Sequence, residues 1–412
     1  MKKYSKLIII TVVMVVTWIV FYVHLQSITD TFARFSFKTI EGDEALIDKI
    51  VVKGDTSSSQ LTYEPFVLTK DDTTYLREAS ITERFGYFYT SEKIKQLQKE
   101  YRQFMRGKNY NVKSYGITED NIYYAEFTFA NFGINPEKIM IEVFDRETEE
   151  SKQVIIDAPE LHTYAYIEKV IPSGDNVFIV VENIISNHTD DTHQVEWQVY
   201  HYDFASETAH EPSKFDIGEI YAYNNFMQVL VDDDRNPSEI VITASIIDYE
   251  EGVHEDYFQY GTEEEAMDHE IVRLVDVKKF NLETKEISTI KIESQELGLP
   301  VAYNGEEIVF LDKNVGELKY STYHLETNIL AERITVPVDN DYFSYWDFHN
   351  TIEQNNYVYT LLNTELSNTI WLYVIDSNTV ELAYKGVIEN VNEESINGID
   401  LMVYFNEIEI LE

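Results

Sequence analysis

The chain contains no cysteine. Disulfides, thiolate nucleophiles, cysteine-ligated zinc, iron–sulfur clusters and a lipid-modified cysteine anchor are therefore excluded. Basic residues are also scarce, because 32 lysines and arginines face 74 aspartates and glutamates, which gives the 412 residues a formal charge of −42. Such a charge repels phosphate backbones, so we expect no nucleic-acid partner. With 44% hydrophobic and 14% aromatic residues, the chain is neither collagen-like nor disordered.

One long apolar run is present, at residues 7–23, and it follows Lys2, Lys3 and Lys6. At about 1.5 Å per residue, a helix of this length just crosses the hydrocarbon core. The lysines favour a cytoplasmic N-terminus, which places the chain after residue 25 outside the membrane. A cleaved signal peptide and a buried soluble helix are the alternatives, but no small-x-small cleavage site follows the run. The sequence therefore predicts an uncleaved, single-pass signal anchor over residues 1–25, with the lipid bilayer as partner through residues 7–23.

The residues that follow predict an extracytoplasmic domain at the cell membrane. A cysteine-free domain in this location is typical of a bacterial surface rather than an animal one. Residues 26–90 contain short β-like runs, which predict a membrane-proximal β segment. Residues 91–108 predict a helix, because apolar residues recur there at helical spacing between Ser91 and Gly107.

The predicted helix at 91–108 carries six basic residues and only two acidic ones. In the simpler interpretation, this basic face is the solvated side of a helix packed on the domain. The alternative interpretation is contact with anionic lipid head groups. The residues that would make this contact are Lys95, Lys99, Arg102 and Arg106.

From residue 109 to 412 the sequence alternates in the manner of β strands, and one hairpin pattern recurs. Each copy has a β run, a polar turn residue, two further residues, a small polar residue and a second β run. The turn residues are Asp145, Asp203, Asn281, His324 and Asp376. Their intervals are near the roughly 40–50 residues of a four-stranded propeller blade, apart from longer ones that contain insertions. The pattern resembles the hairpin between the last two strands of a blade in β-propeller repeat proteins, which implies a fold and no specific family.

The chain ends also predict how the ring closes. Residues 400–405 and 408–411 are strand-like, and we expect them to complete a final blade with strands from about 45–85. This arrangement predicts an all-β propeller of about six blades, with seven as the alternative count. A sandwich of stacked β-sheets is the alternative architecture, because the same alternation would suit it.

Two acidic insertions contain four of the ten histidines. In a propeller, both would join second to third strands of adjacent blades and emerge on one face, where long loops concentrate function. Imidazoles beside carboxylates suit a divalent cation, although no established metal spacing is present, so the metal stays unassigned. The predicted ligand or partner face consists of His188, Asp190, Asp191, His193, His254, Glu255, Asp256, Asp268 and His269.

Established catalytic motifs are missing, including G-x-S-x-G, H-E-x-x-H, the Walker loop and G-x-G-x-x-G. The sequence therefore favours a membrane-anchored binding, sensor or accessory protein that recognises a protein or cell-wall ligand, without an organic cofactor. The alternative is an extracytoplasmic carbohydrate-active hydrolase or lyase whose carboxylates are hidden among the 74 acidic residues. A pair of carboxylates converging on one pocket would favour the enzyme.

Overall fold

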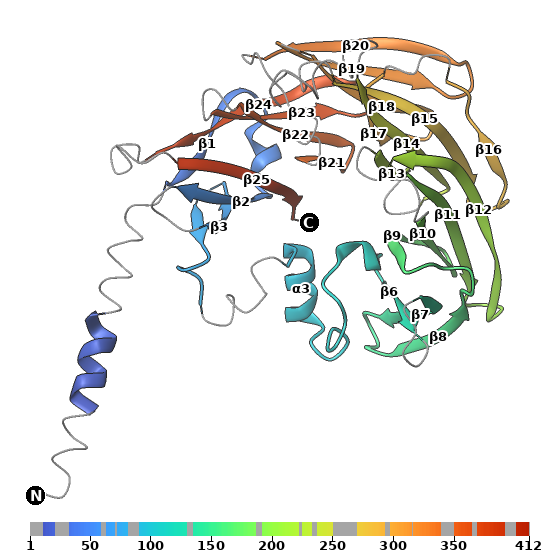
Figure 1. Cartoon of the computed structure of the whole chain (residues 1–412), viewed down its shortest axis with the longest axis horizontal. Helices are drawn as coiled ribbons and strands as arrows, with labels where there is room; N and C mark the ends of the chain where they lie inside the picture. The colour runs from blue at the N-terminus through green and yellow to red at the C-terminus, as the bar shows by residue number, and fades with distance from the viewer. Residues whose placement is uncertain are drawn as a thin grey trace, which may run out of the picture.

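The computed structural model describes residues 11–20, 33–58, 63–70, 72–80, 90–129, 135–186, 192–221, 225–232, 237–249, 270–292, 297–314, 316–338, 350–364, 369–391 and 401–411. In these residues the strands form six antiparallel sheets. The sheets follow one another around a common axis, as blades of a β-propeller (Figure 1). The six predicted blades are thereby confirmed, and the stacked sandwich is excluded.

Blades 1 to 4 each consist of four strands that are consecutive in the chain. Blade 1 contains β5 (Tyr115–Ile117), β6 (Asn121–Phe129), β7 (Pro136–Asp145) and β8 (Ser151–Asp157). Blade 2 contains β9 (Tyr164–Ser173), β10 (Asn176–Ser186), β11 (Thr192–Asp203) and β12 (Thr208–Tyr221). Blade 3 contains β13 (Asn225–Val231), β14 (Glu239–Tyr249), β15 (Glu270–Asn281) and β16 (Ile287–Thr289). Blade 4 contains β17 (Leu299–Tyr303), β18 (Glu307–Asn314), β19 (Glu317–His324) and β20 (Ile329–Pro337).

Blades 5 and 6 combine strands from distant parts of the chain. Blade 5 contains β21 (Thr351–Gln354), β22 (Tyr357–Thr364), β23 (Thr369–Asp376) and β24 (Glu381–Asn390), and β1 (Phe35–Gly42) is added to it as a fifth strand beside β24. Blade 6 contains β2 (Ile50–Ser58), β3 (Glu64–Thr69) and β4 (Thr73–Tyr75), and β25 (Leu401–Ile410) pairs with β2. The predicted closure is confirmed, with one strand at 401–410 in place of two. The fifth strand of blade 5 was not predicted.

All five predicted hairpins join the third strand of a blade to the fourth. In the Asp145 turn, the carboxylate Oδ1 accepts the backbone N–H groups of Glu147 at 2.9 Å and Thr148 at 2.8 Å. Four residues after Asp145, Glu149 has a positive φ of 57°. The same carboxylate or amide bonds recur at Asp203, Asn281 and Asp376. The turns were predictable because this chemistry is local.

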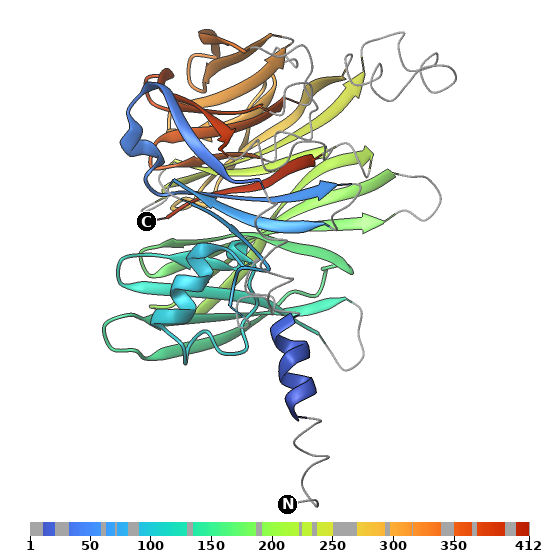
Figure 2. The same cartoon turned by 90° about the vertical axis from the view of Figure 1, so that its left-hand side faces the viewer.

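Apolar clusters fill five of the six junctions between neighbouring blades in the described chain. They lie between blades 1 and 2, 2 and 3, 3 and 4, 4 and 5, and 5 and 6. At the remaining junction, between blades 6 and 1, helix α3 (Glu92–Glu100) packs on blade 1. Both views place α3 beside the strands of blade 1 (Figure 1, Figure 2). We call this junction the seam.

Polar contacts connect α3 to blade 6 across the seam. The buried Lys53 of β2 donates from Nζ to Glu407 at 3.1 Å and also bonds Glu409, and both acceptors lie on β25. Glu409 in turn accepts the backbone N–H of Glu92 at 2.7 Å. Burial raises the pKa of the Glu409 carboxyl, and the nearby Lys53 lowers it. A partly buried charge cluster therefore joins α3 to blade 6.

The helix at 91–108 was predicted too long, because α3 ends at Glu100. Tyr101 leaves the helical conformation with φ −118° and ψ 52°, and residues 102–107 form turns. The change allows Tyr101 and Phe104 to pack against Phe144 of blade 1, with ring centroids 5.2 and 4.7 Å away. Tertiary packing thus overrides the helical period after residue 100.

The predicted anchor is described only in part. Residues 11–20 are helical, and their large apolar side chains are more than half exposed, from 52% at Val15 to 76% at Trp18. Residues 7–10 and 21–23 of the predicted span lie outside the described residues. Within the described part of the chain, no helix has the length and hydropathy needed to cross a bilayer.

Candidate functional site

Two exposed tyrosines lie on β9, the first strand of blade 2. Tyr164 is 53% exposed and Tyr166 is 49% exposed, whereas the alternating residues Ala165 and Ile167 are buried against blade 1. Side chains alternate between the two faces of a strand, so both rings project from the face opposite to this apolar cluster. Both rings lie on the edge strand of blade 2, and two exposed aromatic rings side by side make β9 a candidate contact surface.

A charged pair adjoins the tyrosines. Lys113, in the short 3-10 helix η2 (Val112–Ser114), donates from Nζ to Glu168 Oε2 of β9 at 2.5 Å. The register between β9 and β10 shifts at this point, so Glu168 has no cross-strand partner. The side chain of Glu168 is 15% exposed and that of Lys113 is 51% exposed. The shift is a β-bulge, a device that reorients side chains near functional sites.

A second carboxyl group, that of Glu182 on β10, lies directly across the strand pair from Tyr166. On its other side, Glu182 pairs in register with Trp197 of β11, which is fully buried. Burial raises the pKa of the Glu182 carboxyl to about 7, the charge of Glu168 adds to this effect, and Lys113 opposes it. Near neutral pH the Glu182 carboxyl is therefore close to its own pKa, so it can donate or accept a proton there.

The backbone around this site is fixed by a buried amide. Asn183, which is fully buried, accepts the backbone N–H of His162 at 2.8 Å and donates to the carbonyl of Glu160 at 3.1 Å. The hydroxyl of Thr163 donates to Asn135 at 2.6 Å, which connects blade 1 to the start of β9. The segment before Tyr164 is thus held from both blades. We call Tyr164, Tyr166, Glu168, Glu182 and Lys113 the β9 site.

The β9 site combines two kinds of recognition chemistry. The tyrosine rings offer flat apolar area with a polar tip, which suits sugar rings, apolar side chains and cations. The carboxyl of Glu182 donates a hydrogen bond when protonated and only accepts when ionised. The site can therefore bind a ligand through rings and hydrogen bonds, and the pair of carboxyls can also transfer a proton.

The predicted histidine-rich face lies almost entirely outside the described residues. This applies to His188, Asp190, Asp191, His254, Glu255, Asp256, Asp268 and His269. The backbone of His193 lies in β11, where it pairs with Ser186 and Ile220. The two insertions do join second to third strands of adjacent blades, namely β10 to β11 and β14 to β15. The shared face itself stays a prediction.

The four predicted membrane-contact residues differ in their surroundings. Lys95 bonds Glu92 within α3, and its side chain is only 14% exposed. Lys99 is exposed near the end of α3, and Arg102 and Arg106 are exposed in the turns that follow. The structure therefore leaves three of the four predicted basic residues available at the surface.

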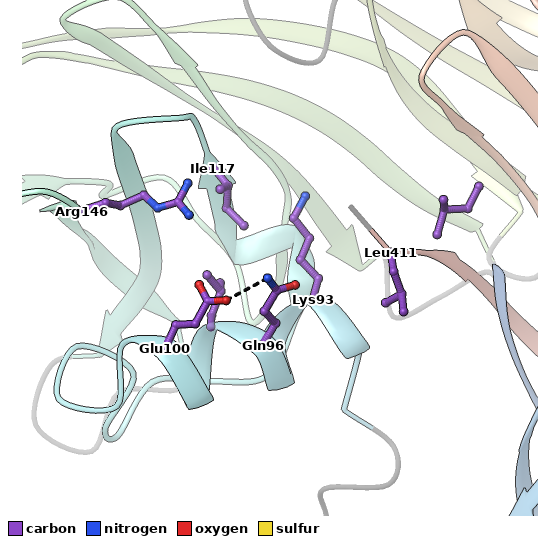
Figure 3. A pocket seen from close by; sticks show the side chains of 8 residues that line it. Lys93, Gln96, Glu100, Ile117, Arg146 and Leu411 are labelled. Carbon is purple, nitrogen blue, oxygen red and sulfur yellow. Dashed lines mark hydrogen bonds between the residues drawn. The ribbon is translucent and has the colours of Figure 1, made fainter. Parts of the chain in front are cut away.

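No metal centre is seen in the described residues, and the pocket at the seam is small. No group of three or more histidine, aspartate or glutamate side chains is suitably placed there to hold a metal ion. A small pocket of about 40 Å³ lies at the seam, lined by residues of α3, blade 1 and the end of β25 (Figure 3). Lys93, Gln96, Glu100 and Arg146 supply its polar lining. This volume accommodates about three waters and is too small for a sugar ring.

Three solved structures that align with this chain do so at low TM-scores and low sequence identity. TolB from Acinetobacter baumannii aligns with a TM-score of 0.30 and 9% identity, over 88% of this chain and 67% of that chain. An oligogalacturonate lyase in complex with manganese aligns with a TM-score of 0.36 and 10% identity, over 84% and 83%. The β-propeller domain of the Trilobed protease from Pyrococcus furiosus aligns with a TM-score of 0.26 and 12% identity, over 72% and 94%. The sequence matches no protein-family model and no curated protein. TM-scores this low do not establish the fold, which the six sheets of the described residues show directly.

Sequence reasoning missed the β9 site, although two signals for it are present. Tyr164 and Tyr166 alternate with apolar residues, which places both rings on one face of a strand. Glu182 and Asn183 interrupt an otherwise apolar run in β10, and a charge in such a run is a candidate functional group. The bulge at Glu168 and the approach of Lys113 depend on tertiary structure, so no local pattern predicts them.

Proposed function

We propose that the protein is a membrane-anchored extracytoplasmic propeller that binds a ligand at the β9 site. The proposal combines the lysine-flanked apolar run at 7–23 with a rigid ring that presents exposed aromatic rings beside two carboxyl groups. Its partners would be the bilayer and a protein or cell-wall ligand.

The apolar helix at 11–20 supports the anchor. Its valine, methionine, tryptophan and isoleucine side chains are more than half exposed, although such groups normally require apolar surroundings. The three lysines before it favour a cytoplasmic N-terminus. Protease added to intact protoplasts should then digest the propeller, and a soluble mature form that begins after residue 23 would contradict the anchor.

The exposure of Tyr164 and Tyr166 is the observation that carries the binding proposal. Tyrosine is enriched in contact surfaces because it buries a large area at a low cost in conformational entropy. Glu182 adds to the argument, because a buried carboxyl that ionises near neutral pH costs folding free energy and is typical of functional sites.

Binding at the β9 site can be tested with a glycan array and a peptide array. Tyr164→Ala with Tyr166→Ala should abolish the signals that the wild-type chain gives. The control variant is Ile329→Ala with Leu330→Ala, which removes two exposed apolar side chains from blade 4, two blades away from the β9 site. Signals that survive the tyrosine substitutions, or that fall equally in the control variant, would locate binding elsewhere.

A carbohydrate-active hydrolase or lyase is the second candidate function, favoured by the two carboxyls alone. Glycosidases use a pair of carboxyl groups, one of them with a raised pKa, and here Glu182, whose pKa is raised, lies near the Glu168 carboxyl that Lys113 contacts. In an enzyme, Glu182→Gln should reduce kcat on a cleaved glycan at least a hundredfold. In a binding protein, no glycan would be cleaved by the wild type and the same substitution would change only Kd.

A further inference from the structure

A basic surface on this acidic protein lies at the seam. Lys99, Arg102 and Arg106 are all exposed, and none of them makes an ion pair in the described structure. Most other basic residues of the described chain have carboxylate partners, as Lys95 and Lys108 have in Glu92 and Glu142. We call Lys99, Arg102 and Arg106 the seam patch.

The backbone that carries the seam patch is held firmly. Ile94 and Leu97 of α3 and Phe104 and Met105 of the following turns are buried in one cluster with blade 1. Lys108 closes the segment, because its Nζ donates to the carbonyl of Phe104 at 2.6 Å and to Glu142 at 2.8 Å. The three cations are therefore presented from a fixed surface and not from a loose loop.

We call residues 24–32, which follow the predicted span, the N-terminal tether. The tether and the seam patch are attached to the same blade. The carbonyl of Ala33 accepts the hydroxyl of Tyr75 at 2.7 Å, and Arg34 bonds Glu78, so the tether joins blade 6 at β4. The start of α3 joins the same blade at β25, through the bond from Glu92 to Glu409. Strands β25 and β4 are three spacings apart in this sheet, about 14 Å.

The tether is also short. Residues 24–32 connect the predicted span to Ala33, and nine extended residues reach at most about 30 Å. Blade 6 is thereby held close to the bilayer if the anchor spans it. The patch would then meet the membrane surface repeatedly, within the range of about 8 Å over which charges attract at physiological salt.

We propose that the seam patch docks the propeller on anionic lipid head groups, with Lys99, Arg102 and Arg106 as the contacts. This inference depends on the proposed membrane anchor. Docking fixes the orientation of the ring, with the seam toward the bilayer and blades 3 and 4 away from it. Negative charges near the patch limit the strength of docking. Glu100 lies within the patch, and the glutamate-rich turn at 147–150 adjoins it through the bond from Arg146 to Tyr101. Docking should therefore require anionic lipid and weaken with salt.

The absence of cysteine allows a direct test on the full chain. One cysteine is introduced at Gln103, which is exposed between Arg102 and Arg106, or at Thr327 in a blade 4 turn, and is labelled with a fluorophore. The labelled chain is reconstituted into vesicles of phosphatidylcholine alone or of equal parts phosphatidylcholine and phosphatidylglycerol, with a quencher on the lipid head group. We expect strong quenching at position 103 only in the mixed vesicles, and weak quenching at position 327 in both.

A matched pair of variants separates the patch from the overall charge. Lys99→Gln, Arg102→Gln and Arg106→Gln together should lower the ratio of docked to undocked protein on the order of a hundredfold. Lys38→Gln, Lys214→Gln and Lys319→Gln change the net charge equally, but on blades 5, 2 and 4, and should leave quenching unchanged. Equal loss in both variants, or equal quenching at positions 103 and 327, would overturn the proposal.

Flotation tests the anchor separately. A chain that floats with pure phosphatidylcholine vesicles but shows no lipid-dependent quenching at position 103 retains the anchor and refutes docking. A chain that floats only with the mixed vesicles refutes the anchor. In that case, loss of flotation in the patch variant and not in its control still supports docking, and equal loss in both refutes it.

Discussion

Replacing Glu182 by glutamine should make the protein more stable at alkaline pH. The buried Glu182 carboxyl has a pKa raised to about 7 in the folded protein, against an ordinary value of 4.5 in the unfolded chain. Between these values the folded state binds more protons, so the free energy of unfolding falls as pH rises from 4.5 to 7. Above pH 7 the whole cost of the buried charge is present. Glutamine keeps the shape and removes the charge.

The size of the effect follows from the shift in pKa. A shift of one unit corresponds to about 1.4 kcal/mol, so the raised pKa corresponds to about 3 kcal/mol at pH 8. The entropy of unfolding is about 2.1 cal/mol/K per residue, or about 0.8 kcal/mol/K for the propeller. The variant should therefore melt about 4 °C higher than the wild type at pH 8, and at the same temperature near pH 4.5.

Thermal melts followed by circular dichroism at several pH values provide the assay. Glu211→Gln is the control, because Glu211 is exposed on β12 of the same blade and its removal should change stability by less than about 0.5 kcal/mol. Equal melting temperatures for the Glu182 variant and the wild type at pH 8 would refute the burial argument. A gain that is as large at pH 4.5 as at pH 8 would refute it as well, because titration could not then be the cause.

Three further predictions concern stability and titration. Lys53→Ala leaves the mostly buried Glu409 carboxyl and the half-exposed Glu407 carboxyl without their cation, and it should lower the free energy of urea unfolding by about 3 kcal/mol. Lys38→Ala, in an exposed pair, should cost less than about 1 kcal/mol. Glu149→Gly should raise the free energy of unfolding by about 0.5–1 kcal/mol, because φ is 57° at this position and glycine adopts a positive φ without strain. Glu147→Gly should not raise it. Burial lowers the pKa of the His201 imidazole to about 4, so its NMR titration midpoint should lie near that pH, and its contribution to stability should be lost as pH falls from 6.5 toward 4.

The blade count could be predicted from sequence because its signal is local. The turn at Asp145 is held by the side chain of one residue and two backbone N–H groups within three positions. The same turn recurs in blades 2, 3 and 5, so its spacing reports the repeat. The closure was predictable for a different reason, since strand-like residues at both ends of the chain need partners.

Features that depend on contacts between blades could not be predicted in this way. The end of α3 is set by Phe144, which lies more than forty positions along the chain from Tyr101 and attracts its ring. The near-neutral pKa of Glu182 depends on burial and on Glu168 from the neighbouring strand. Alternation shows only that Glu182 shares a strand with apolar residues. The histidine-rich insertions were predicted in the correct connections, but connectivity alone does not show what they bind.

The pairing of β2 with β25 has a consequence for how the chain acquires its structure during synthesis. Lys53 and Glu407 meet across 354 residues, and closing so long a loop costs about 4 kcal/mol more entropy than closing a tight hairpin. Blades 1 to 4 use only consecutive strands, so each can form as the chain emerges from the ribosome, whereas β2, β3 and β4 must wait for β25. Until then blade 6 has an unpaired strand edge, which invites association with other chains. A nascent chain arrested before residue 401 should therefore recruit chaperones for as long as the arrest lasts.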